Sequence, residues 1–209
     1  MTFSSRLDAG RRLARHLAEV GAPVDVVVGL PRGGVIVAAE IARALNRPLD
    51  VLVVRKLGHP RSREFAVGAL AEGGVILLHD DVLRSSNVNR AELDEIIAEE
   101  SSRLKEYQAL FEAGQRTPLA QKSVLLVDDG LATGATMEVA AMAARQQGAS
   151  RVAVAVPVAS TSGYARIAKV SDAVHALLID PNFQAVGQHY SRFPQTSDQE
   201  VLQALAWRV

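Results

Sequence analysis

Short apolar runs of strand length recur along the chain, and this pattern constrains the fold more than any other feature. The runs are Val24–Leu30, Leu49–Val54, Val124–Val127, Val152–Val158 and Val174–Ile179. Near-continuous apolar runs of this length are typical of strands that are buried on both faces of a parallel sheet. Helical segments alternate with them, so the sequence predicts an α/β fold with an open, mostly parallel sheet and helices on both faces.

Helix signals frame this sheet at both ends of the chain. Ser5 to Val20 is predicted to form an amphipathic helix, with its apolar side made by Leu7, Leu13, Leu17 and Val20. Asn89 is expected to cap a long helix, and Ser197 is expected to cap a short one that runs to Trp207.

Two segments after the second apolar run depart from the alternation. Gly58–Glu64 is polar and basic and is predicted to be a mobile loop, whereas Val67–Leu78, interrupted by Glu72–Gly74, could be a hairpin. We therefore expect one domain over residues 1–209, with a core at about 20–180. A lid would lie at about 57–66, and a small C-terminal hood at about 180–209.

Composition excludes several classes of protein. The 23 Lys and Arg residues balance the 23 Asp and Glu residues, so there is no electrostatic case for a nucleic-acid or membrane partner. Cysteine is absent, which excludes thiolate metal sites and fits a reducing compartment. The five histidines show no ligand spacing, and no apolar run approaches the roughly 20 residues of a membrane span. A soluble, cytoplasmic protein is expected.

The segment from Val124 to Thr136 carries the chemistry. An apolar strand delivers Asp128 and Asp129 to its carboxyl end, where ligands bind in open α/β sheets. A loop with two glycines and two threonines then opens a helix, whose free N–H groups form an anion site. The two acids need a different partner, either a vicinal diol or Mg²⁺ held through its water shell. A phosphorylated ribose combines these features.

Residues 124–136 resemble the 5-phosphoribosyl-1-pyrophosphate (PRPP) signature of type I phosphoribosyltransferases, and Val28–Gly34 resembles the pyrophosphate loop of that family. The resemblance covers about residues 20–180, and the chain is similar to small stand-alone bacterial members. It implies transfer of the phosphoribosyl group from PRPP to a nitrogen acceptor, a nucleobase, with release of pyrophosphate. It also implies Mg²⁺ as cofactor and a homodimer.

The resemblance assigns a role to each residue of the two motifs. The 5-phosphate would be bound by Gly130, Leu131, Ala132, Thr133, Gly134, Ala135 and Thr136. Pyrophosphate would be bound by Pro31, Arg32, Gly33, Gly34, Arg55 and Lys56. The catalytic set would be Asp128, Asp129, Arg32 and Lys56, and the two acids would hold the ribose hydroxyls and, through water and substrate, Mg²⁺.

Some roles stay open at this point. Arg55 and Lys56 could instead form a solvated strand end, and Arg61 and Arg63 could be catalytic-loop cations or plain loop charges. Phe183 and Tyr190 could roof the acceptor or pack in the core.

Other readings of the phosphate motif fit less well. A Walker loop requires Lys where Ala135 stands, and no dinucleotide fingerprint occurs. The family members that use 6-oxopurines carry a third acid at the position of Ala132, so hypoxanthine and guanine are disfavoured as acceptors. A non-catalytic PRPP- or nucleotide-sensing regulator and a hydrolase of phosphorylated ribose remain alternative functions.

Overall fold

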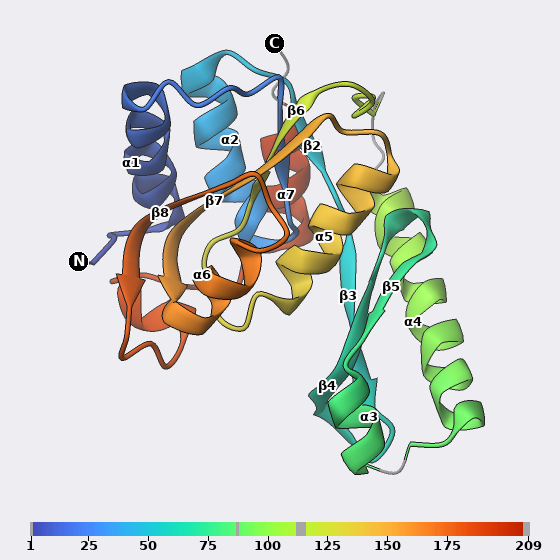
Figure 1. The fold of residues 1–209 in the computed structure, drawn as a ribbon. Coiled ribbons are helices and arrows are strands. Elements are labelled where there is room, and N and C mark those ends of the chain that lie inside the picture. Colours follow the sequence, from blue (N-terminus) through green and yellow to red (C-terminus); the bar gives the residue numbers. More distant parts are fainter. Residues whose placement is uncertain (1, 87, 112–115, 207–209) are drawn as a thin grey trace.

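The computed structural model describes residues 2–86, 88–111 and 116–206 (Figure 1). Its central sheet has five strands, and every neighbouring pair runs parallel. In spatial order they are β2 (Leu49–Val51), β1 (Val26–Gly29), β6 (Ser123–Val127), β7 (Arg151–Ser160) and β8 (Ala173–Asp180). The predicted α/β fold with an open parallel sheet is confirmed.

Helices cover both faces of this sheet, and the strand side chains alternate between them. On one face α1 (Arg6–Glu19) and α2 (Gly33–Leu45) pack over Val27 and Leu125. On the other face α5 (Ala135–Gln146) and α6 (Thr161–Ile167) pack over Val26 and Leu126 (Figure 1). These strands are therefore buried on both sides, which explains their continuous apolar sequences.

Helix α1 begins where the sequence predicts, because the Ser5 side chain accepts a hydrogen bond from the Asp8 backbone N–H. Its buried side was predicted incompletely. Leu7 and Val20 are exposed, and the buried stripe is made by Ala9, Gly10, Leu13, Ala14 and Leu17. Small residues face α2 because the two helices approach closely: a Cβ on Gly10 would lie 2.8 Å from the Val37 carbonyl oxygen.

A second, antiparallel sheet projects from the central one (Figure 1). It contains β3 (Val54–His59), β4 (Ser62–Ala71) and β5 (Val75–Leu78), and it is followed by α3 (Asp80–Ser86) and α4 (Arg90–Phe111). We call these elements the arm. The hairpin expected at residues 67–78 is confirmed as β4 and β5, joined by a short 3-10 turn at Glu72–Gly74.

The start of the arm corrects two predictions. The run Leu49–Val54 is not one strand, because the chain leaves the central sheet after Val51 and enters β3 at Val54. The buried Glu72 carboxylate accepts the Val53 N–H at 2.7 Å, which anchors this crossing. The segment 58–64 is not an irregular loop either. It forms the end of the β3–β4 hairpin, where His59 pairs with Ser62.

The remaining elements lie around the edges of the two sheets. Both predicted caps are present: Asn89 and Glu92 exchange hydrogen bonds at the start of α4, and Ser197 and Glu200 form a capping box on α7 (Asp198–Leu205). Trp207, the expected end of that helix, lies outside the described residues. The sequence did not predict α3, α6 or the 3-10 turn Val186–His189. Among the described helices, none is long and apolar enough to cross a membrane.

Candidate active site

Both predicted motifs follow neighbouring strands and meet at one edge of the sheet. Strands β1 and β6 pair in parallel with Gly29 opposite Val127, so the segments 31–34 and 128–136 leave the sheet together. A Cβ on Gly33 would lie only 2.0 Å from Asp129 Oδ2, and one on Gly34 would lie 2.7 Å from the Val127 carbonyl oxygen. Glycine is required at both positions because any side chain would separate the two segments. The peptide bond between Pro31 and Arg32 is cis.

Asp129 is engaged by an arginine that the sequence did not point to. Arg6 Nε lies 2.7 Å from Asp129 Oδ2, with side chains only 12% and 15% exposed. Arg6 also donates to the Pro194 carbonyl oxygen at 2.7 Å and lies over the ring of Phe193 at 3.8 Å. The Tyr190 hydroxyl donates to the Asp129 carbonyl oxygen at 2.6 Å. Asp129 is thereby fixed to both ends of the described chain.

Asp128 is the more available carboxylate for a ligand. Its Oδ1 accepts the Asp129 backbone N–H at 2.8 Å. Burial and the neighbouring Asp129 carboxylate raise the pKa of Asp128 well above its usual range, since both disfavour the charged form. Burial also raises the pKa of Asp129, and the charge of Arg6 opposes that shift. A cation or a pair of hydroxyl donors at this point would relieve the repulsion between the two acids.

The loop after the acids is held by β7 and α6. The Leu131 N–H donates to the Val158 carbonyl at 2.8 Å, and the Ser160 hydroxyl donates to the Ala132 carbonyl. The Ser160 hydroxyl also accepts the Gly163 N–H, so it joins the loop to the start of α6. The sequence did not predict these supports, because α6 was not expected.

The helix that this loop opens is twelve residues long, and its start offers free N–H groups for an anion. Gly134 precedes it with φ +78, a conformation that favours glycine. Ala132 and Thr133 are exposed, whereas Ala135 and Thr136 are partly buried in the first turn. Gly130 packs against Val186, since a Cβ there would lie 2.5 Å from that side chain. The segment Gly130–Thr136 is therefore a loop with an open face at a helix start, as predicted.

The basic residues expected to contact pyrophosphate do not all lie together. Arg55 and Lys56 do not follow a strand of the central sheet, because they lie within β3 of the arm. Arg55 nevertheless shares a hollow of about 280 Å³ with the pyrophosphate loop. The residues that line it are Pro31, Arg32, Val53, Val54, Arg55 and Tyr107. Lys56 is exposed and lines a different hollow in the arm. Arg32 Nη1 lies 3.6 Å from Asp198 at the start of α7.

The residues left open by the sequence take structural roles in the arm and the C-terminal segment. Arg61 lies 3.7 Å from Glu92, and Arg63 lies 2.7 Å from Glu99, so both face α4. Tyr190 is buried and packs on Phe3 with ring centroids 5.5 Å apart, which favours the core over an acceptor roof.

The donor set fits Mg²⁺ held mainly by a substrate. Within the described ranges, no three His, Cys, Asp or Glu side chains gather as a metal site. Mg²⁺ is commonly bound by one or two carboxylates together with substrate phosphates and water. Asp128 fits such a role better than Asp129, because Arg6 engages Oδ2 of Asp129.

Comparison with known proteins agrees with this geometry. Residues 4–190 match the family model described as phosphoribosyl transferase domain, and the chain belongs to this family. Its crystallographic relative TT1426 from Thermus thermophilus is 41% identical, with a TM-score of 0.82 over 98% of each chain.

Two curated relatives come from Mycobacterium tuberculosis, strains CDC 1551 / Oshkosh and ATCC 25618 / H37Rv. Both carry the name "Putative phosphoribosyl transferase", and each is 46% identical over 201 residues. The match covers 96% of this chain and 45% of each relative, so the chain spans about half their length.

Proposed function

We propose that this protein transfers the 5-phosphoribosyl group from PRPP to a nitrogen acceptor, a nucleobase, and releases pyrophosphate. The observation that carries the proposal is the contact between the two glycine-bearing segments. Gly33 and Gly34 pack directly against the acidic segment at Asp128 and Asp129. A ligand that reaches both segments needs phosphate groups at two ends and hydroxyls between them, and PRPP has this arrangement.

In this proposal the phosphate groups are bound by backbone as much as by side chains. The N–H groups of Gly130–Thr136 and the hydroxyls of Thr133 and Thr136 bind the 5-phosphate. The segment 31–34, with the guanidinium groups of Arg32 and Arg55, binds the pyrophosphate. Arg55 replaces Lys56 as the second cation, because Arg55 lines the hollow beside Pro31 and Lys56 does not.

The carboxylates take different roles. Asp128 accepts hydrogen bonds from the ribose hydroxyls and helps to hold Mg²⁺ through water and substrate. Asp129 positions the segment through its ion pair with Arg6. Mg²⁺, when bound, neutralises charge that develops on the leaving pyrophosphate. Catalysis is then electrostatic and positional: Arg32 and Arg55 stabilise the leaving group while Asp128 fixes the sugar.

The acceptor is narrowed by what is absent from the loop. Ala132 is exposed and offers no carboxylate to a base, so a 6-oxopurine is disfavoured. Adenine, orotate and other nitrogen acceptors fit the proposal equally. The reaction is assigned to the cytoplasm and to a homodimer, with no nucleic-acid or membrane partner.

Measuring pyrophosphate release separates this proposal from its alternatives. Purified protein is mixed with PRPP and Mg²⁺, with and without each member of a nucleobase panel. The transferase predicts release that depends on one acceptor and yields its ribonucleotide. Release without any acceptor would identify a hydrolase of phosphorylated ribose. Binding of PRPP without release under any condition would identify a sensor and would overturn the catalytic proposal.

A further inference from the structure

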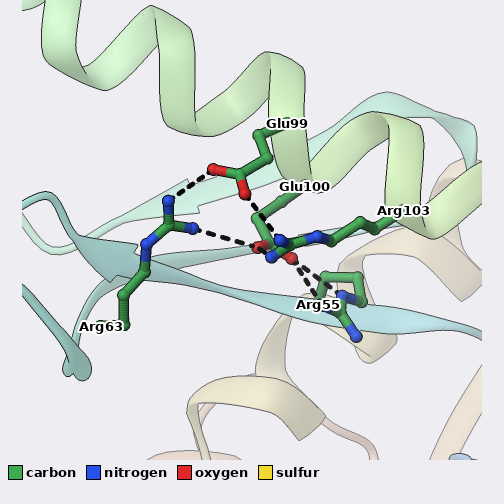
Figure 2. Close-up of polar contacts among 5 residues, drawn as sticks. All are labelled: Arg55, Arg63, Glu99, Glu100 and Arg103. Atoms are coloured by element: carbon green, nitrogen blue, oxygen red, sulfur yellow. Dashed lines mark hydrogen bonds and ion pairs between the residues drawn. The ribbon is translucent and has the colours of Figure 1, made fainter.

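Three arginines from three different elements of the arm converge on one buried carboxylate (Figure 2). The Glu100 side chain on α4 is only 6% exposed. Arg55 of β3 lies 2.8 Å from it, Arg103 of α4 lies 2.7 Å away, and Arg63 of β4 lies 3.8 Å away. Glu99 stands at the rim, 2.7 Å from both Arg63 and Arg103.

These side chains surround a hollow with an excess of positive charge. Its volume is about 360 Å³, at the lower end of the range of about 300–1,000 Å³ for small-molecule sites. The residues that line it are Val54, Arg55, Lys56, Gly58, Arg63, Glu100 and Arg103. Four of them are cationic and one is anionic. When Glu99 at the rim is included, two positive charges still lack a counter-charge from this set.

The arginines keep donors for a ligand. A guanidinium has five N–H groups, and Arg55 gives two of them to Glu100, at 2.9 Å and 2.8 Å. Glu100 also holds the three arginine heads in place, so less side-chain entropy is lost when an anion binds. The planar donor fork of arginine matches the oxygens of a phosphate group, which it binds in bidentate fashion.

A local irregularity of the hairpin shapes the hollow. The register of β3 against β4 shifts on both sides of Gly58, which is the mark of a β-bulge. A Cβ on Gly58 would lie 2.7 Å from the Arg63 carbonyl oxygen, so glycine is needed for the strands to approach there. Bulges re-aim side chains, and here the bulge lies beside the arginine that completes the cluster.

We propose that the arm hollow is a second anion site, separate from the PRPP site, for a ligand with a pyrophosphate group, either free or as part of a nucleotide. A diphosphate fits better than a single phosphate because the cations come from three elements and surround the hollow. Arg55 lines both this hollow and the one beside Pro31 and Arg32. A bound anion therefore acts on an arginine that also faces the pyrophosphate loop, which makes the site regulatory.

Calorimetric titration with inorganic pyrophosphate, without Mg²⁺, tests the site. The test variant carries Arg63→Gln and Arg103→Gln. The matched control carries Arg11→Gln and Arg90→Gln, which removes two paired surface arginines outside the hollow. We expect the test variant to lose one binding site per chain, or to weaken it on the order of 100-fold, because two charge-assisted contacts are lost. The control keeps the wild-type stoichiometry.

Glu99→Gln gives an independent test with the opposite sign. It removes a negative charge from the rim of the hollow without touching buried Glu100, so pyrophosphate should bind more tightly. Unchanged stoichiometry and affinity in both variants would overturn the proposal and leave the cluster a purely structural clamp. If the site exists, competition by nucleoside diphosphates but not by nucleosides identifies a nucleotide as its ligand, and competition by neither identifies free pyrophosphate.

Discussion

Gly33→Ala is the sharpest perturbation of the contact between the two motifs. A methyl group at residue 33 would lie 2.0 Å from Asp129 Oδ2 and 2.7 Å from Arg6 Nε. Ordinary contact begins at 3.4 Å, so the carboxylate oxygen would have to move by about 1.4 Å. The substitution therefore separates the pyrophosphate loop from the acidic segment and disturbs the Arg6–Asp129 ion pair.

The size of the effect follows from this displacement. A misplacement of about 1 Å at a catalytic centre costs on the order of 100-fold in rate. Overpacking costs about 1–3 kcal/mol of folding stability, and each kcal/mol lowers Tm by about 2–4 °C in a chain of this length. We expect turnover with PRPP to fall by about 100-fold, while the protein stays folded and melts about 2–12 °C lower.

Initial rates and thermal melts of Gly33→Ala are compared with those of a control, Gly21→Ala. Gly21 has φ +61 and nothing within 4 Å of an added Cβ, so alanine there introduces backbone strain of about 1 kcal/mol without touching the site. The control should lose stability and keep activity. If Gly33→Ala keeps activity within about twofold of wild type, or if Gly21→Ala loses as much, the reasoning is refuted.

Two further predictions concern stability. Arg116→Met leaves the buried carboxylates of Asp50 and Glu72 without a shared guanidinium partner, and we expect urea unfolding to show a loss of about 3–5 kcal/mol; a change below about 1 kcal/mol would contradict this. A backbone hydrogen bond from Val152 lowers the pKa of Asp172 below its usual 3.8, so this group stabilises the fold above that pH and loses its contribution as pH falls through the lowered pKa. Melts across this acid range should show a smaller loss of Tm for Asp172→Asn than for wild type, and parallel curves would contradict the assignment.

The central sheet could be predicted from the sequence because burial on both faces leaves a local signature. The run Val124–Val127 needed only one residue, Ser123, to become the observed β6. The same signature failed at Leu49–Val54, where one apolar run passes from the central sheet into the arm. The crossing is fixed by Glu72, which accepts the Val53 N–H from 19 residues away, and such a contact has no local signal.

The site was predictable in its motifs and not in its supports. Asp128 and the loop that opens α5 could be assigned from strand, acids, glycines and threonines in one segment. The partner of Asp129 could not, because Arg6 is 123 residues away and its helix shows only arginines on a polar face. Arg55 was assigned to the end of a strand, and the structure instead places it within β3 against Glu100, because tertiary packing decides where the arm begins.

Calorimetric titration of PRPP with Mg²⁺ into wild-type protein, Asp128→Asn and Asp25→Asn tests the central claim most directly. Both aspartates accept a backbone N–H at 2.8 Å, but Asp25 lies before β1, at the opposite edge of the sheet. The account predicts micromolar binding to the wild type and to Asp25→Asn, and at least about tenfold weaker binding to Asp128→Asn, which loses one charge-assisted contact. Folded wild-type protein that binds no PRPP, or an Asp128→Asn variant that binds it as tightly as wild type, would contradict the account.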